Sequence, residues 1–197
     1  MSATNRGTKR NEADFYATPL ETIYSLLDNY DGIKSSDSIL EPSAGNGNII
    51  QALRNRGYKN HITAIELREE ERYNLIGKAD RVGILDYLKV ESEKIGKYDV
   101  IIGNPPYCLA QEFIDKSLNL LNPGGRLILL LRTNFLESKK RCEWWQDKLP
   151  SGLYVLSKRP SFTGQGTDAT SYSWFIWELQ TNKQTNKQTN NKSNLRR

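Results

Sequence analysis

The sequence predicts an α/β protein built around a doubly wound, mostly parallel β-sheet. Short apolar segments with strand character alternate along the chain with amphipathic, helix-like segments. Two of the apolar segments, Tyr98–Ile102 and Arg126–Leu131, are dominated by Ile, Leu and Val, as is typical of parallel strands buried on both faces. This alternation favours helices on both sides of the sheet and right-handed crossover connections.

Seven strands and five helices are expected in order along the chain. The strands are expected at Ser38–Leu40, Ile62–Ile65, Arg81–Leu85, Tyr98–Ile102, Arg126–Leu131, Leu153–Ser157 and Tyr172–Leu179. The helices are expected at Leu20–Leu27, Asn48–Arg56, Arg68–Leu75, Ala110–Leu121 and Glu137–Lys148. Pro19 suits the first turn of its helix. The last strand alternates and is rich in aromatic residues, which favours an antiparallel or edge position.

The length of 197 residues suits one domain, expected at 14–179. The flanking ranges 1–13 and 180–197 are polar, and the second contains the repeat QTNKQTNKQTNN, so both are expected to be disordered arms. The net charge of +5 belongs to these arms, because 14–179 holds 20 basic and 22 acidic residues, a net of −2. Within the domain, 132–159 holds seven basic and three acidic residues and is the expected basic face.

Composition excludes several classes of protein. No apolar run approaches the roughly 18 residues of a membrane span, and the first residues lack the apolar stretch of a secretory signal, so a cytoplasmic protein is expected. One histidine, His61, and two cysteines, Cys108 and Cys142, argue against Ser–His–Asp or Cys–His catalysis and against a metal site. His61 is expected at the surface, and Cys108 has no neighbouring general base.

A glycine-rich turn follows the first strand in the segment ILEPSAGNGNI, residues 39–49. Glycines allow positive φ and a close approach of the backbone to a ligand. Glu41 stands at the strand end and the segment lacks GK[ST], so a phosphate ligand is disfavoured and a cationic or amino-bearing one is favoured. The alternative is a tight strand–helix turn with a surface acid.

Acidic residues also end the next two strands. Glu66 closes ITAIE, where a carboxylate can accept both hydroxyls of a ribose. Asp86 follows RVGIL, where it could accept the amine of an adenine whose ring packs on Leu67, Leu85 or Tyr87. One acid at a strand end is common by chance, but three on successive strands after a glycine turn favour a site.

The fourth motif is Asn104-Pro105-Pro106-Tyr107, directly after the strand YDVII and Gly103. The prolines fix φ and lack N–H groups, which leaves a stiff turn rich in acceptors. The side-chain oxygen of Asn104 and the carbonyl of Pro105 can both accept from one NH₂ group, and Tyr107 offers a flat face for a planar group. The alternative is a turn that merely ends a strand.

Taken together, these motifs resemble those of S-adenosylmethionine-dependent methyltransferases, and among them the DNA adenine-N6 enzymes with an NPPY motif, across about residues 14–179. The resemblance implies a Rossmann-like, seven-stranded sheet of the class I methyltransferase type, with S-adenosyl-L-methionine as cofactor. It implies that DFYATP, residues 14–19, closes over the methionine end of the cofactor. The implied cofactor-binding residues are Tyr16, Thr18, Pro19, Glu41, Ala44, Gly45, Gly47, Glu66, Asp86 and Tyr87. The implied catalytic residues are Asn104, Pro105, Pro106 and Tyr107.

The resemblance also implies double-stranded DNA as partner and a flipped target base, which Tyr107 and Phe162 would stack on both sides. Phosphate contacts are expected from the basic residues Arg132, Lys139, Lys140, Arg141, Lys158 and Arg159. A large recognition domain has no room in 197 residues, so a short target or a separate specificity partner is expected, as in a phage- or prophage-type orphan enzyme. RNA (adenine N6 or guanine N2) or protein glutamine methylation, and a catalytically silent nucleic-acid-binding module, remain alternatives.

Overall fold

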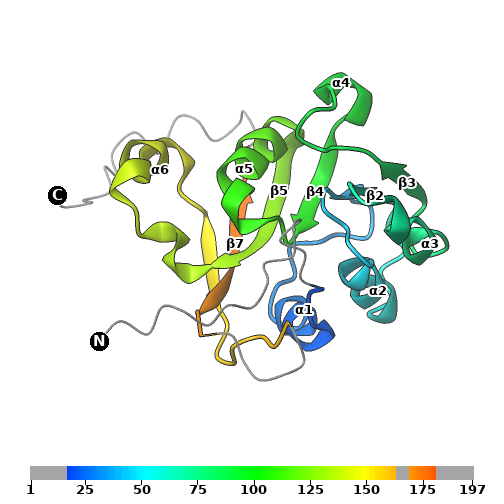
Figure 1. Cartoon of the computed structure of the whole chain (residues 1–197), viewed down its shortest axis with the longest axis horizontal. Helices are drawn as coiled ribbons and strands as arrows, with labels where there is room; N and C mark the ends of the chain where they lie inside the picture. Colours follow the sequence, from blue (N-terminus) through cyan, green and yellow to red (C-terminus); the bar gives the residue numbers. More distant parts are fainter. Residues whose placement is uncertain (1–16, 163–168, 181–197) are drawn as a thin grey trace.

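The computed structural model describes residues 17–162 and 169–180, and its centre is one seven-stranded sheet (Figure 1). The strand order is β3-β2-β1-β4-β5-β7-β6. The strands are β1 (Ile39–Glu41), β2 (Ile62–Glu66), β3 (Arg81–Ile84), β4 (Tyr98–Gly103), β5 (Leu121–Arg132), β6 (Gly152–Val155) and β7 (Tyr172–Glu178). Strands β1 to β5 pair in parallel, whereas β7 runs antiparallel to both β5 and β6. The predicted fold class is therefore confirmed.

Helices cover both faces of the sheet because every central strand is apolar on both sides. On one face, α1 (Leu20–Leu27), α2 (Asn48–Asn55) and α3 (Arg72–Leu75) pack on residues such as Ile39, Val100 and Trp174. On the other face, α4 (Ser92–Ile95), α5 (Ala110–Asn119) and α6 (Cys142–Lys148) pack on residues such as Leu40, Ile101 and Phe175. Short 3-10 turns precede three of these helices. Turn η1 (Glu69–Glu71) precedes α3, η2 (Tyr107–Leu109) precedes α5, and η3 (Thr133–Leu136) and η4 (Lys139–Arg141) precede α6.

The structure corrects several of the expected elements. The helix expected at Glu137–Lys148 is only α6, because 133–141 forms two 3-10 turns, and the helix expected at Arg68–Leu75 begins as η1. Strand β5 begins at Leu121, ahead of the predicted Arg126, because Leu121 pairs with Tyr98 before the register shifts. Helix α4 was not expected. The antiparallel direction of the last strand is confirmed, and β7 lies inside the sheet, between β5 and β6.

The chain order reverses between β1 and β4, and the crevice at the carboxyl ends of such neighbouring strands is where open α/β sheets bind ligands. This edge lies below the sheet in Figure 1, where the arrow of β4 points. None of the described helices is both long and apolar enough to cross a membrane. The expected arm at 1–13 and residues 181–197 of the other arm lie outside the described residues, so the domain limits remain a prediction.

Candidate active site

A cavity of about 350 Å³ opens at the carboxyl edge, where β1 and β4 part. Its walls come from the ends of β1 to β4, the segment before α1 and the start of α5. The predicted site residues that line it are Thr18, Glu41, Ala44, Gly45, Glu66, Asp86, Tyr87, Asn104, Pro105, Pro106 and Tyr107. Pro19 and Gly47 do not line it but precede α1 and α2 directly, and Tyr16 lies outside the described residues.

The glycine turn wraps the end of β1 and leads into α2. Gly45 and Gly47 have φ of 54° and 79°, the left-handed region that glycine adopts without strain. The turn is tied internally and to β2, since the N–H of Gly47 donates to the Ala44 carbonyl at 2.8 Å and the N–H of Ala44 to the Ile65 carbonyl at 2.9 Å. The turn is therefore held in one shape against the neighbouring strand.

Glu66 connects this turn to the end of β2. Its Oε2 accepts the N–H of Gly45 at 2.7 Å, and its Oε1 accepts the backbone N–H and Nε of Arg68 at 2.9 and 3.0 Å. Arg68 in turn contacts Glu71 at 3.1 Å. The carboxylate is buried yet borders the cavity, and its hydrogen bonds with Gly45 and Arg68 fix its position there.

Glu41 lies deeper, with 2% of its surface exposed. Burial and the neighbouring charge of Glu66 raise the pKa of Glu41 well above its ordinary value, and the backbone of Ile50 and the charge of Lys78 oppose this only partly. Its Oε2 has no hydrogen-bond partner among the described residues. A buried acceptor of this kind favours a positively charged or N–H-bearing ligand, which would stabilise the ionised carboxylate.

The end of β3 supplies the third acid. Oδ1 of Asp86 accepts the Leu88 N–H at 3.0 Å, and a hydrogen bond from Lys89 is the first cause that holds the pKa of Asp86 below its ordinary value. Tyr87 is turned beneath α5, where its hydroxyl lies 2.9 Å from Ser117 Oγ and its ring centroid 5.1 Å from that of Phe113. Burial accordingly raises the pKa of Tyr87.

Apolar side chains line the cavity beside these acids. Leu67 and Leu85 come from the strand ends, and Leu109 and Phe113 from η2 and α5. Leu67 is 62% exposed at the cavity wall, so its side chain is open to a bound ligand. The sequence interpretation missed Leu109 and Phe113, although their position five and nine residues after Asn104 could have indicated a helix returning over the same edge.

The Asn104–Tyr107 turn faces the segment that precedes α1. Asn104 Nδ2 donates to Thr18 Oγ1 at 3.0 Å, and the Thr18 carbonyl accepts Asn48 Nδ2 at 2.8 Å. Thr18 is 5% exposed, so these bonds form in a largely dry place. Asn48 is a further residue that the sequence interpretation missed.

A cluster of aromatic rings lies next to this turn. The Tyr107 centroid lies 5.6 Å from that of Tyr172, and the Phe162 centroid lies 5.1 Å from it, so the two predicted stacking residues share Tyr172 as a support. The Arg132 guanidinium lies over the Tyr107 ring, 5.0 Å from its centroid. Burial is the first cause that raises the pKa of the Tyr107 hydroxyl well above its ordinary value.

The predicted phosphate-contacting residues fall into different settings. Lys139 and Lys140 are exposed on η4, and Lys158 and Arg159 are exposed after β6. Arg141 is held within the fold, because its guanidinium donates to the Phe135 carbonyl at 2.7 and 3.2 Å and stacks on the Phe135 ring.

Three other residues that the sequence singled out can be placed. His61 has a side chain 56% exposed, as expected. Of the neighbouring tryptophans on α6, Trp145 is a core residue. Trp144 is half-buried and donates to the Asp115 carboxylate at 3.0 Å, so it is neither a lid nor an exposed contact.

The sheet order and the position of the cavity define the class I S-adenosylmethionine-dependent methyltransferase fold, which solved structures share. One, from Listeria monocytogenes and described as such a methyltransferase, is 17% identical, with a TM-score of 0.65 over 84% of this chain and 61% of that one. PH1948 from Pyrococcus horikoshii, described as an RNA methyltransferase, is 16% identical, with a TM-score of 0.63 over 90% and 94%. The M protein of the type I restriction enzyme EcoKI is 17% identical, with a TM-score of 0.63 over 83% and 44%.

The chain thus spans 61% of the length of the Listeria protein and less than half of the EcoKI protein. No family model and no curated protein sequence matches it. At these identities the likeness concerns the fold.

Proposed function

We propose that this protein transfers the methyl group of S-adenosyl-L-methionine to the exocyclic N6 amine of adenine in DNA. The observation that carries the proposal is a single cavity lined both by the acids of three successive strand ends and by the Asn104–Tyr107 turn. The first group suits a cationic adenosine derivative and the second an amino group. Their junction is where a methyl group would pass from one to the other.

The residues fit this cofactor. The buried oxygen of Glu41, which has no partner within the described part of the chain, is suited to an ammonium group, and Glu66, fixed by Gly45 and Arg68, to ribose hydroxyls. Asp86 stands beside the apolar end of the cavity, where it would accept an adenine amine. The likeness to S-adenosylmethionine-dependent enzymes in fold supports the same assignment.

The chemistry that S-adenosylmethionine supplies when bound is an electrophilic methyl group on a sulfonium. Adenine N6 is a poor nucleophile because its lone pair is delocalised into the ring. The Asn104 side-chain oxygen and the Pro105 carbonyl would accept its two N–H bonds, which directs the lone pair toward the methyl and stabilises the positive charge that develops on nitrogen. Preorganised dipoles of this kind contribute several kcal/mol in enzymes, about 3–4 for one group. Holding the reactants in line supplies the remainder.

The target base must leave the duplex to reach this site, at a cost of a few kcal/mol. Stacking on aromatic rings, worth about 1–3 kcal/mol per base, would offset that cost. Tyr107 and Phe162, which both pack on Tyr172, are the proposed stacking residues. Arg132, which already lies over the Tyr107 ring, would contact the target nucleotide or its phosphate, and the exposed basic residues of 139–140 and 158–159 would contact the strand.

RNA is the second candidate substrate, because the neighbour that the chain covers almost completely is described as an RNA methyltransferase. The deciding experiment supplies DNA, RNA and a glutamine-bearing protein separately with isotopically labelled S-adenosylmethionine. Digestion of the DNA to nucleosides should yield labelled N6-methyladenine by mass spectrometry. Label only in RNA or protein would refute the DNA assignment, and no cofactor binding at all would indicate a silent nucleic-acid-binding module.

A further inference from the structure

A groove runs between α1 and the segment that follows β6, beside the candidate active site. Its volume is about 670 Å³. Glu21 and Ser25 of α1, with Asn29 just after this helix, form one wall, residues 153–160 form the other, and Trp174 of β7 lies between them. Figure 1 shows α1 in blue next to this yellow to orange segment, at the edge toward which β4 points.

The segments that form both walls of the groove lie next in the chain to residues of the candidate site. On one side, Thr18 precedes α1 by two residues and accepts the hydrogen bond from Asn104. On the other side, Phe162 follows Pro160 by two residues and packs against Tyr172. Strand β6 runs parallel to β5, because both are antiparallel to β7, so the end of β6 reaches the same carboxyl edge. One end of each groove wall therefore lies at the same edge of the sheet as the cavity.

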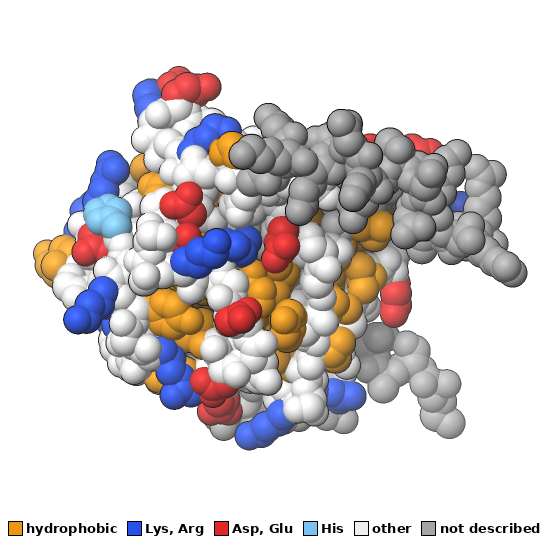
Figure 2. All heavy atoms as spheres, turned by 180° about the vertical axis from the view of Figure 1, so that it is seen from behind, with side chains coloured by type: hydrophobic (Ala, Val, Ile, Leu, Met, Phe, Trp, Pro, Cys, Tyr) orange, Lys and Arg blue, Asp and Glu red, His pale blue; other side chains and the backbone are white. Residues whose placement is uncertain are grey.

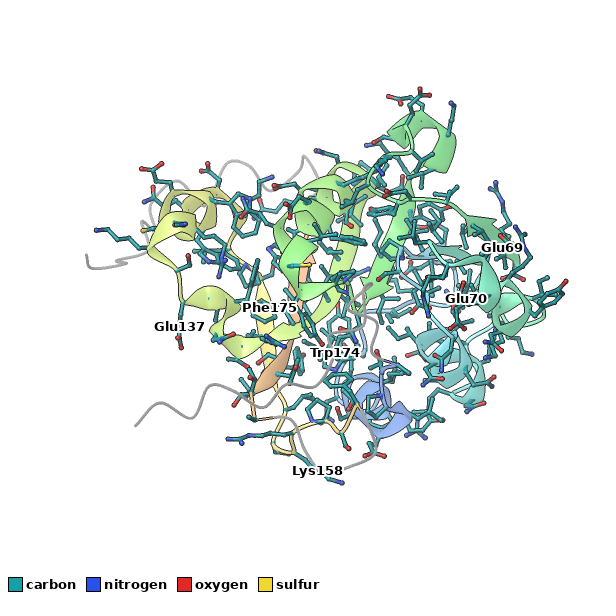
Figure 3. The ribbon with its side chains drawn as sticks, in the orientation of Figure 1. Glu69, Glu70, Glu137, Lys158, Trp174 and Phe175 are labelled. Carbon is teal, nitrogen blue, oxygen red and sulfur yellow. The ribbon has the colours of Figure 1, made fainter. Side chains whose placement is uncertain are left out.

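The groove offers cations at its rim. Lys158 is 81% exposed and its contact with Glu21 spans 3.9 Å between two largely exposed side chains, so the pair contributes little and the ammonium group is available to a phosphate. Arg159 is also exposed. In Figure 3, Lys158 projects at the lower rim, whereas Glu69 and Glu70 lie on the far right, beyond α2.

The groove also offers an aromatic and apolar surface next to these cations. Leu153, Tyr154 and Val155 of β6 are 38%, 36% and 61% exposed. The Tyr154 ring meets Tyr30 edge-on at 5.9 Å, so the ring is supported while part of it stays open. Figure 2 shows hydrophobic side chains exposed across the middle of the face opposite to that of Figure 1, with charged side chains around them.

We infer that this groove holds the DNA strand that flanks the target nucleotide. Cations for phosphates beside an aromatic face for bases are the combination that single nucleic-acid strands require. The inference rests on the proposed function for its choice of DNA, and on the common edge of groove walls and cavity for its position. Ser25, Asn29 and Tyr154 thereby join Lys158 and Arg159 in one binding surface.

The test measures DNA binding without methyl transfer, by fluorescence anisotropy of labelled 24-nucleotide DNA, single-stranded and duplex, in the absence of cofactor. The variants are Ser25→Glu, which places a charge on the α1 wall without removing a cation, and the double variant Lys158→Glu with Arg159→Glu. The matched control is Lys97→Glu, an exposed lysine just before β4 at the opposite edge of the sheet. Circular dichroism checks that each variant is folded.

The double variant should weaken binding about tenfold or more and flatten its salt dependence, because phosphate contacts set that slope. Ser25→Glu should weaken binding at least threefold, and Lys97→Glu less than twofold. Equal effects of Ser25→Glu and Lys97→Glu, or no DNA binding by the unaltered protein, would overturn the inference. Tighter binding of RNA of the same sequence would also overturn the inference. A Ser25→Glu variant that disrupts a dimer but leaves DNA binding unchanged would do the same.

An error in the groove assignment and an error in the proposed function would give different experimental results. DNA binding that depends on the groove, without N6-methyladenine formation, would support the groove and refute the methyltransferase proposal. Methyl transfer with unchanged binding in both groove variants would refute the groove alone.

Discussion

The hydroxyl of Thr18 should control the rate of methyl transfer through a single hydrogen bond. Thr18 Oγ1 accepts Asn104 Nδ2 at 3.0 Å, which turns the side-chain oxygen of Asn104 away from Thr18. Thr18→Val keeps the side-chain shape and removes this acceptor. A net hydrogen bond contributes about 0.5–1.5 kcal/mol, so the oriented amide should become roughly two- to thirteenfold less populated. The single-turnover rate at saturating cofactor should fall by that factor, and the backbone of Thr18 should stay in place because its carbonyl still accepts from Asn48.

The comparison with Asn104→Ala makes this reasoning testable. Removing the acceptor itself should slow transfer about 10²- to 10³-fold, the effect of deleting one preorganised polar group. If Thr18 acts only through Asn104, then Thr18→Val should have no further effect in the Asn104→Ala background. Rates would be followed as label transferred to an oligonucleotide with enzyme in excess. An equal loss in both backgrounds, or a loss that appears in cofactor affinity alone, would refute the reasoning.

Three further predictions concern the acids and the glycine turn. Because the pKa of Glu41 is raised in the folded protein, the stability of the fold should decrease as pH rises above the ordinary glutamate pKa of about 4.3. Glu41→Gln should remove this decrease in thermal melts from pH 5 to 8. The same dependence of Tm on pH in both proteins would contradict the prediction. Glu66→Gln should weaken cofactor binding about tenfold or more by calorimetry, since hydrogen bonds to a charged group contribute about 1.5–3 kcal/mol; an unchanged Kd would exclude the assigned role. Gly47→Ala should lower Tm more than Gly57→Ala. Both glycines have positive φ, but only at Gly47 would the added Cβ meet Leu75, at 3.1 Å. Equal decreases in Tm would show that backbone strain alone sets the loss of stability.

Much of the fold could be predicted because it depends on local pattern. The apolar segments over 62–65 and 98–102 are strands in the structure, and the helix expected at Leu20–Leu27 has those limits. The errors fall where tertiary pairing overrides local preference. Leu121 enters β5 ahead of a Pro-Gly-Gly sequence because it pairs with Tyr98, and residues 133–141 form short turns although their composition is compatible with a helix.

The candidate site divides in the same way. The acids and the Asn104–Tyr107 turn could be found because each directly follows an apolar strand, and parallel strands end at one edge. Residues from other parts of the chain could not be found in this way. Leu109, Phe113 and Asn48 line the cavity from helices. Tyr172, at the start of an antiparallel strand, packs against the rings of Tyr107 and Phe162. Their sequence setting is that of ordinary core or capping residues.

The sequence by itself determined the alternation of strands and helices, the seven-stranded α/β class and the order in which acids and the NPPY turn arrive at the strand ends, because these follow from local periodicity and chain connectivity. Only the tertiary structure decided the distances between them. Glu41 is buried beside Glu66, and Thr18 accepts a hydrogen bond from Asn104, 86 positions away in the chain. Arg141 donates to a backbone carbonyl within the fold, and α1 and the segment after β6 enclose a groove. These relations depend on burial and on the packing of distant segments, which no local pattern encodes.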